Sequence, residues 1–188
     1  VTKGLVLDFP DRVLDTPISE AAITGVATGS ALLGKRPILE IQFSDFLTVA
    51  IDQIVNEAAK IHFLSQGSQS VPMVIRAASG SGTGASAQHS QSFENWFTHV
   101  PGLIVAMPSN AYDAKGILVS AVKNNNPVII FEPKSLYKTA MEVPDDLYEV
   151  PLGVAKQVKS GDDLTIIAIG RMVDVAKEEI GRASCRER

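Results

Sequence analysis

The chain has 188 residues and a formal net charge of −4; 45% of its residues are hydrophobic and 20% are charged. This length allows one full domain, or one domain and part of another, and the composition is typical of a globular protein with a sizeable core. The small negative charge gives no electrostatic reason to expect nucleic acid or an anionic membrane as a partner. No apolar run is long enough to cross a bilayer, so we expect neither partner.

Short β-rich apolar runs alternate with longer helical patterns along the chain. In chain order, the patterns predict a helix over 18–33, a strand over 37–43, a helix over 46–64, strands over 72–77 and 103–107 separated by a helix over 92–99, a helix over 111–123, and strands over 127–132 and 164–170. Hydrophobic strands separated by helices predict an α/β fold, in which helices cover both faces of a mostly parallel sheet.

The character of the sequence changes after the fourth predicted strand. Residues 133–163 are polar, contain Pro144, Pro151 and Gly161, and show no clear period. We therefore predict a first domain over 1–140, a linker over 141–163, and the truncated start of a second domain over 164–178.

The two ends of the chain differ from those of a complete protein. The N-terminus, VTKGLVLDF, lacks an initiator Met and the pattern of a signal peptide, so the sequence reads as a fragment that starts inside a gene. Residues 179–188, EIGRASCRER, resemble the translation of a sequencing adapter, and we predict that they are a non-native tail. The tail holds the only cysteine, Cys185. Without the tail the chain has no cysteine, which argues against disulfides and thiolate metal sites.

A glycine-rich loop follows the second predicted strand. The segment SGSGTGASAQHSQSFENWF (79–97) places His89 at the far end of this loop, just before a helix. Loops at the carboxyl ends of strands in an open α/β sheet are where ligands bind. A lone histidine is usually structural or solvated, and the two interpretations of His89 have about equal weight. His62 and His99 are expected at surface or helix-capping positions.

Two further residues have a structural and a functional interpretation. Glu20 opens an apolar helix, where a carboxylate either complements the partial positive charge of the helix N-terminus or faces a ligand. Phe46 begins a helix directly after a strand, where an aromatic residue is more often part of the core than of a ligand platform.

Several motifs at consistent spacing carry a family resemblance. RVLDTPISE, EIQFSDF, IDQIVNEAAK, AQHSQS, PGLIVAMPSNAYDAKG and NNPVIIFEPKSLY resemble the β subunits of thiamin-diphosphate-dependent 2-oxo acid dehydrogenases, of the pyruvate dehydrogenase type and the similar acetoin dehydrogenase type. The resemblance extends from Val1 to about Glu178. It implies a transketolase-type pyrimidine-binding domain followed by the start of a C-terminal domain.

The resemblance assigns roles to three residues. The acid that follows the family's Thr-Pro-Ile motif maps onto Glu20, and implies a carboxyl group that hydrogen-bonds to the N1′ nitrogen of the thiamin pyrimidine and shares a proton with it. The family's aromatic residue that packs on the pyrimidine maps onto Phe46, and its active-site histidine maps onto His89. These assignments favour the ligand-facing interpretation of Glu20.

The family also binds a structural potassium ion through backbone carbonyls. These positions map onto Met73, Ala121, Val122, Asn124 and Asn126, with Asn124 in place of the more usual Asp. The other interpretation of Asn124–Asn126 is an ordinary turn that ends a helix, and it has similar weight.

The resemblance also implies a division of the cofactor site between two chains. The family holds the cofactor's diphosphate and magnesium with a Gly-Asp-Gly motif, which this sequence lacks. We therefore expect an α subunit to hold magnesium and the diphosphate in an α2β2 assembly, and a lipoyl-bearing acyltransferase to receive the acyl group. The fragment is expected to be inactive alone.

Three functions stay open at this point. The leading prediction is a dehydrogenase of a 2-oxo acid, with pyruvate as the expected substrate. The alternatives are an acetoin-cleaving dehydrogenase and a non-catalytic α/β binding module. We expect a bacterial cytoplasmic location, while a mitochondrial one stays open because the sequence starts inside a gene.

Overall fold

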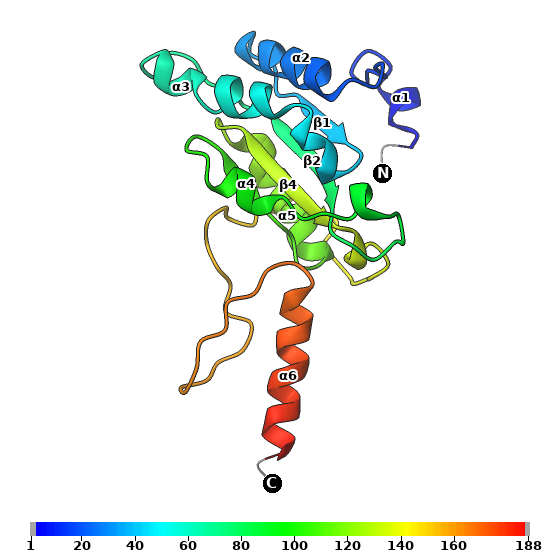
Figure 1. The fold of residues 1–188 in the computed structure, drawn as a ribbon, viewed down its shortest axis with the longest axis vertical. Coiled ribbons are helices and arrows are strands. Elements are labelled where there is room, and N and C mark those ends of the chain that lie inside the picture. Colours follow the sequence, from blue (N-terminus) through cyan, green and yellow to red (C-terminus); the bar gives the residue numbers. More distant parts are fainter. Residues whose placement is uncertain (1–2, 187–188) are drawn as a thin grey trace.

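The computed structural model describes residues 3–186, and its centre is a four-stranded parallel sheet (Figure 1). The strands are β1 (Ile38–Ile41), β2 (Val74–Ser79), β3 (Ile104–Ala106) and β4 (Val128–Pro133), in the order β1-β2-β4-β3. Every neighbouring pair is parallel, and the longest ladder joins β2 to β4, from Val74↔Val128 to Ser79↔Pro133. The predicted α/β class with a parallel sheet is confirmed.

Helical segments connect these strands and cover the sheet. They are α1 (Leu5–Asp8), α2 (Glu20–Leu32), η1 (Ser44–Thr48), η2 (Gln53–Ala58), α3 (Ile61–Leu64), η3 (Ala87–His89), α4 (Glu94–Thr98), α5 (Ala111–Lys123), η4 (Lys134–Leu136) and α6 (Met172–Arg186). None of the helices in the described part of the chain could span a membrane.

Alternate residues of each central strand enter two different hydrophobic cores, because successive side chains point to opposite faces of a sheet. Ile75, Ile129 and Phe131 pack in the larger core, with residues of α2, η1, η2 and α4. Val74, Val128 and Ile130 pack on the other face with α5 residues, among them Ile117 and Ala121. All of these strand residues are almost fully buried, which explains why β2 and β4 read as continuous hydrophobic runs.

The predicted helices are confirmed at three places and wrong at one. The predictions over 18–33, 92–99 and 111–123 correspond to α2, α4 and α5. The single helix predicted over 46–64 is instead divided into a 3₁₀ turn in η1, a π-helical turn in η2 and the short α3. The β-branched residues Val49, Ile51, Ile54 and Val55 disfavour a regular α-helix, and in η2 the amide of Ala59 donates to the carbonyl of Ile54, five residues earlier, at 3.0 Å.

The prediction of a fifth strand over 164–170 is wrong. Four of the five predicted strands form, but these residues are irregular, and Leu164 and Ile167 are 75% and 89% exposed. A strand needs a neighbour that accepts its backbone hydrogen bonds. Within residues 3–186 this segment pairs with no strand of the sheet, so its β-rich sequence remains unpaired.

The chain beyond β4 packs partly on α5. Tyr148 stacks on Tyr112 with ring centroids 4.3 Å apart, and the hydroxyl of Ser120 donates to the carbonyl of Val150 at 2.7 Å. The predicted linker is therefore irregular but partly attached to the first domain. The predicted division into a domain, a linker and a second domain stays a prediction.

The predicted non-native tail overlaps α6. This helix runs without interruption from Met172 to Arg186 and projects away from the sheet (Figure 1). The helix thus begins within the predicted start of the second domain and continues into residues 179–186. Residues 187–188 of the predicted tail lie outside the described residues.

Candidate functional site

The carboxyl ends of β2 and β4 lie side by side, because Ser79 of β2 pairs with Pro133 of β4. The loop that leaves β2 contains glycines with positive φ, and an added Cβ on Gly82 (φ +117°) would lie 3.5 Å from Ser135. Ser86 also has a positive φ of 67°, with ψ −178°, a region that residues other than glycine rarely adopt. The loop therefore follows a strained path that brings its far end back to the sheet.

His89 and Phe46 meet at this end of the sheet. Their ring centroids are 5.4 Å apart with planes at 88°, and the centroids of Phe43 and His89 are 4.6 Å apart at 86°. Edge-to-face packing of this kind orients the imidazole, and within residues 3–186 no described hydrogen bond involves its ring nitrogens. Both His89 and Phe46 are half-buried, so each still presents part of its surface to solvent. The structure thus brings together two of the three residues predicted for catalysis and cofactor binding.

Lys134 is a neighbour of this cluster that sequence reasoning missed. Its ammonium donates a hydrogen bond to the backbone carbonyl of His89 and lies 5.0 Å from the centroid of the Phe43 ring. Its side chain is almost fully enclosed, with the residue 6% exposed. One signal could have found it: a lysine placed directly after the buried strand PVIIFEP, at the sheet edge where the His89 loop begins.

Glu20 is the first residue of α2 and is half-buried. Within residues 3–186, its carboxylate takes part in no described hydrogen bond or ion pair. One turn later, the hydroxyl of Thr24 is fully buried without a hydrogen-bond partner, as is the side-chain oxygen of Gln53 in the facing η2. A free carboxylate at a helix start can bind a polar group. No described contact joins Glu20 to Phe46 or His89.

The carbonyls predicted to bind potassium are mostly occupied. Arg36 Nη1 donates to the carbonyls of Val122 and Asn124 at 2.9 and 2.8 Å. The carbonyl of Met73 accepts from Val128 at 3.0 Å, and that of Ala121 accepts from Asn124 at 3.2 Å.

Asn124 is also the C-cap of α5, and its side-chain oxygen accepts from the amide of Asn126 at 2.8 Å. The guanidinium already places a positive charge on two of the expected oxygens. These contacts fit the helix-ending turn better than a potassium ion, and the potassium site stays a prediction. Across residues 3–186, no group of three or more His, Cys, Asp or Glu side chains could hold a metal ion.

A cavity of about 490 Å³ lies between α5 and the sheet, on the face opposite the His89 cluster. Arg76 lines it and donates from Nε to Glu132 Oε1 at 2.7 Å, while its Nη1 lies 3.5 Å from Glu40 Oε2. The hydroxyl of Tyr137 donates to Glu132 Oε2 at 3.0 Å. Burial alone would lower the pKa of Arg76, but the hydrogen bond and charge of Glu132 outweigh it and raise that pKa. Burial and the Glu132 carboxylate raise the pKa of Tyr137.

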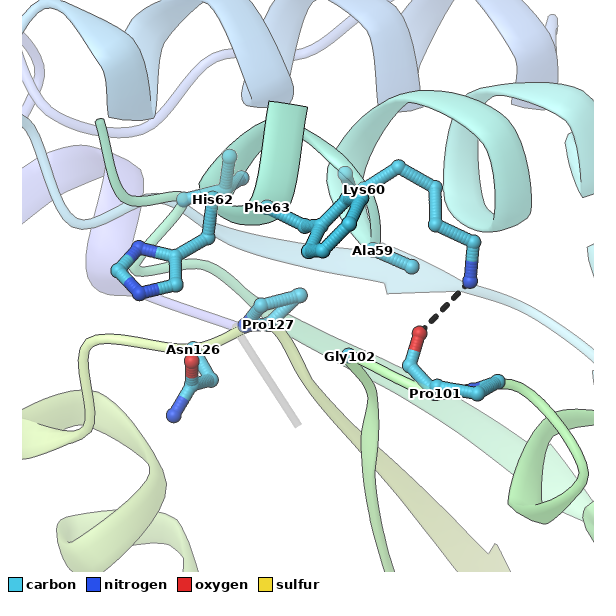
Figure 2. Close-up of a pocket in the computed structure, with 10 residues that line it drawn as sticks. Ala59, Lys60, His62, Phe63, Pro101, Gly102, Asn126 and Pro127 are labelled. Atoms are coloured by element: carbon cyan, nitrogen blue, oxygen red, sulfur yellow. Dashed lines mark hydrogen bonds between the residues drawn. The ribbon is translucent and has the colours of Figure 1, made fainter. Parts of the chain in front are cut away.

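A second cavity, of about 340 Å³, lies at the opposite edge of the sheet, where the strands begin (Figure 2). His62, Phe63 and Asn126 are among its lining residues, and Lys60 donates to the carbonyl of Pro101 at 2.8 Å. His62 Nδ1 lies 2.8 Å from the carbonyl oxygen of Gln69, consistent with the surface or capping position predicted for this residue. Neither cavity is lined by Glu20, Phe46 or His89.

Comparison with known proteins decides the family. The model for the transketolase pyrimidine-binding domain matches residues 1–139. The chain belongs to this family. All three predicted catalytic and cofactor-binding residues lie within the matched region, together with Lys134 and the Arg76 network.

The similar curated proteins include β subunits of an acetoin oxidoreductase and of pyruvate dehydrogenase. Over 99% of its length the chain is 46% identical to the β subunit of acetoin:2,6-dichlorophenolindophenol oxidoreductase from Bacillus subtilis, of which it covers 55%. Over 95% of its length it is 49% identical to the protein of the same name from Cupriavidus necator, covering 53%. It is 43% identical to the mitochondrial pyruvate dehydrogenase E1 β subunit of Mus musculus over 92% of its length, covering 50%. The chain thus spans about half the length of the curated relatives that it matches.

A solved structure agrees with this assignment. The chain superposes on a split-gene transketolase, described as an inactive β4 tetramer, with a TM-score of 0.81 and 25% sequence identity. The superposition covers 99% of this chain and 57% of the other. The resemblance to thiamin-diphosphate-dependent dehydrogenase β subunits and the predicted transketolase-type fold are confirmed.

The pyrimidine-binding domain depends on close approach of two backbones at Gly102, beside the smaller cavity. Gly102 has φ +98°, and an added Cβ would overlap the carbonyl oxygen of Ala59. Gly34 has a similar φ of +83° but open space around it. We predict that Gly34→Ala lowers the free energy of unfolding by about 1 kcal/mol, from backbone strain alone. Gly102→Ala should cost roughly 2 kcal/mol more because the clash adds to the strain.

Urea denaturation of both variants measures the difference. Equal losses of stability for Gly102→Ala and Gly34→Ala would contradict the close approach of residues 59 and 102.

Proposed function

We propose that this chain is the pyrimidine-binding part of the β subunit of a thiamin-diphosphate-dependent 2-oxo acid dehydrogenase, with pyruvate as the substrate. The family match and the β-subunit relatives support the proposal. The observation that carries it within the molecule is the meeting of His89 and Phe46 at the carboxyl edge of the sheet. The family resemblance implies an active-site histidine and a pyrimidine-packing aromatic residue at these two positions, which supports the proposal.

Cleavage of acetoin is a second candidate, supported by sequence identity. The two acetoin oxidoreductase β subunits are 46% and 49% identical to this chain, against 43% for the mouse pyruvate dehydrogenase β subunit. The same cofactor and the same residues serve both reactions in this proposal. The choice between pyruvate and acetoin therefore depends on the groups around the substrate, some of which another chain would contribute.

The proposal divides the cofactor site between two subunits. This sequence has no Gly-Asp-Gly motif, so an α subunit would hold the diphosphate and magnesium in an α2β2 assembly. A lipoyl-bearing acyltransferase would receive the acyl group. Thiamin diphosphate, when bound, supplies the carbon nucleophile that accepts the substrate and takes up the electrons released by decarboxylation.

Glu20 and Phe46 would bind the pyrimidine ring. The Glu20 carboxylate is half-buried and is engaged in no described interaction within residues 3–186, so an oxygen is available to a ring nitrogen. Holding or sharing one proton at that nitrogen is the contribution of Glu20 to activation of the cofactor. Phe46 would offer the exposed part of its ring as an apolar surface for the pyrimidine, while Phe43 and His89 pack against the ring edge to face.

His89 would act after decarboxylation. Transfer of the acyl group to a lipoyl disulfide breaks the sulfur–sulfur bond, and the departing sulfur needs a proton. The imidazole is held by two aromatic rings, and no described hydrogen bond within residues 3–186 engages its nitrogens, so a nitrogen is open to that transfer. Loss of the carboxyl group as carbon dioxide needs no such donor.

The first test of this function concerns Glu20. In the complete β subunit assembled with its α subunit, Glu20→Gln should keep the fold and lose most cofactor activation, because the amide cannot share a proton. Hydrogen–deuterium exchange at C2 of the bound thiamin measures activation directly. The control is Glu57→Gln, the same change at an exposed position of η2. Exchange as fast in Glu20→Gln as in the control would remove Glu20 from the mechanism.

The second test separates the two steps assigned to the site. His89→Ala should slow reductive acylation of a lipoyl domain by roughly 100- to 10,000-fold, the range of general acid catalysis, and should slow decarboxylation less. An artificial electron acceptor reports decarboxylation, and a lipoyl domain reports acyl transfer. His99→Ala, at an exposed turn, is the matched control. Equal losses in both assays would leave His89 with a structural role only.

A further inference from the structure

We propose that Lys134 is a positioning residue that fixes the end of the 80–93 loop, and with it the His89 imidazole, through the His89 backbone carbonyl. The catalytic consequence of this inference rests on the function proposed for His89. The positioning itself rests on contacts within this chain.

The loop is closed at its base, where the Gly80 amide donates to the carbonyl of Gln91 at 3.0 Å, but its own contacts hold the His89 end only weakly. Its first half turns through Gly82 at φ +117°, and Ser86 adopts φ 67° and ψ −178° just before the short η3 turn that contains His89. A non-glycine residue persists in such a conformation only when its surroundings impose it. Inside η3, the amide of His89 makes only a long 3.4 Å contact to the carbonyl of Ser86. Contacts from outside the loop must therefore hold His89 in place.

Besides the packing of Phe43 and Phe46 on the imidazole, two polar anchors from different elements supply those contacts. On one side, Asp45 of η1 accepts from the Gln91 backbone amide at 3.3 Å and from Gln91 Nε2 at 2.8 Å. On the other side, Lys134, the first residue of η4, donates to the carbonyl of His89. Asp45 and Lys134 are both buried. The loop end is thus held between η1 and η4, with His89 next to the lysine anchor.

The burial of Lys134 indicates a specific role for its charge. Taking an ammonium out of water is unfavourable unless hydrogen bonds or charges replace the lost solvation. Within residues 3–186, no described ion pair contains Lys134. The replacements are one carbonyl and the face of the Phe43 ring, 5.0 Å away, and both belong to the cluster around the imidazole. A buried methionine would fill the same space without the desolvation cost, but could not hold the carbonyl.

Strand pairing explains why this anchor is well placed. The ladder between β2 and β4 ends with Ser79 opposite Pro133. The next residue on one strand starts the His89 loop, and the next on the other is Lys134. The lysine therefore follows one of the two central strands directly, and its contact with His89 ties the loop end to the sheet.

The test uses the 188-residue chain without cofactor or substrate, so its outcome is independent of the proposed function. Lys134→Met keeps the aliphatic stem, Lys134→Arg keeps a charged donor, and Lys138→Met is the same change at an exposed lysine. Hydrogen–deuterium exchange with mass spectrometry follows the peptides over 80–93, and diethylpyrocarbonate modification follows His89. Thermal unfolding reports the stability of each variant.

We expect Lys134→Met to raise two rates by at least about tenfold: amide exchange over 80–93 and modification of His89 by diethylpyrocarbonate. The loss of one charged hydrogen bond is large enough for this change, and exchange elsewhere in the chain should change little. Lys134→Arg should restore slow exchange, and Lys138→Met should match the unmodified protein. Unchanged exchange over 80–93 in Lys134→Met would overturn the proposal, and so would a rise spread evenly over the whole chain. If Lys134→Met does not fold, Lys134→Gln takes its place with the same expected and opposing results.

Discussion

The parallel pairing of β2 with β4 is the constraint on which the rest of the molecule depends. Its register, from Val74↔Val128 to Ser79↔Pro133, sends alternate side chains into the two hydrophobic cores. The same register fixes where both strands end, so the loop after β2 and the residues after β4 begin side by side. A shift of one residue would exchange the two faces of the sheet and separate Lys134 from the loop.

Charged side chains are partly or fully buried at two places beside this strand pair. On the α5 face, Arg76 of β2 and Glu132 of β4 form a partly buried ion pair that joins the strands beside a cavity. At the carboxyl edge, Lys134 and the His89 cluster form a half-buried site with aromatic walls. Burial of charge is unfavourable in both places and is offset by hydrogen bonds whose partners the strand register supplies. Rigid strands thus hold a site whose residues mostly lie on loops and helix ends.

The sequence predicts most of this fold, because hydrophobic runs and helical periods are local signals. β2, β4 and α5 are found where those signals lie. The fifth strand, over 164–170, failed because a strand depends on a neighbour that its own residues do not encode. The helix over 46–64 failed because its packing against α2 and its β-branched residues favour a π-helical turn.

The site was predictable only in part, and the reason is again non-local. Spacing along the chain left His89 undecided, and only family motifs suggested the roles proposed for Glu20, Phe46 and His89. The contact between His89 and Phe46 joins residues 43 positions apart, and Lys134 reaches His89 across 45 positions. No local sequence pattern spans separations of this size. Two of the carbonyls that the family motifs name for potassium, those of Val122 and Asn124, accept from Arg36 in the structure, and the potassium site stays a prediction.

The central claim is that this chain supplies the pyrimidine half of a thiamin diphosphate site and needs a second subunit for the diphosphate half. Calorimetric titration of thiamin diphosphate with magnesium tests it most directly, first into the isolated chain and then into the complete β subunit assembled with its α subunit. The account predicts no measurable binding by the isolated chain and tight binding by the assembly. A micromolar dissociation constant for the isolated chain, about −8 kcal/mol, would contradict the division of the site between two subunits.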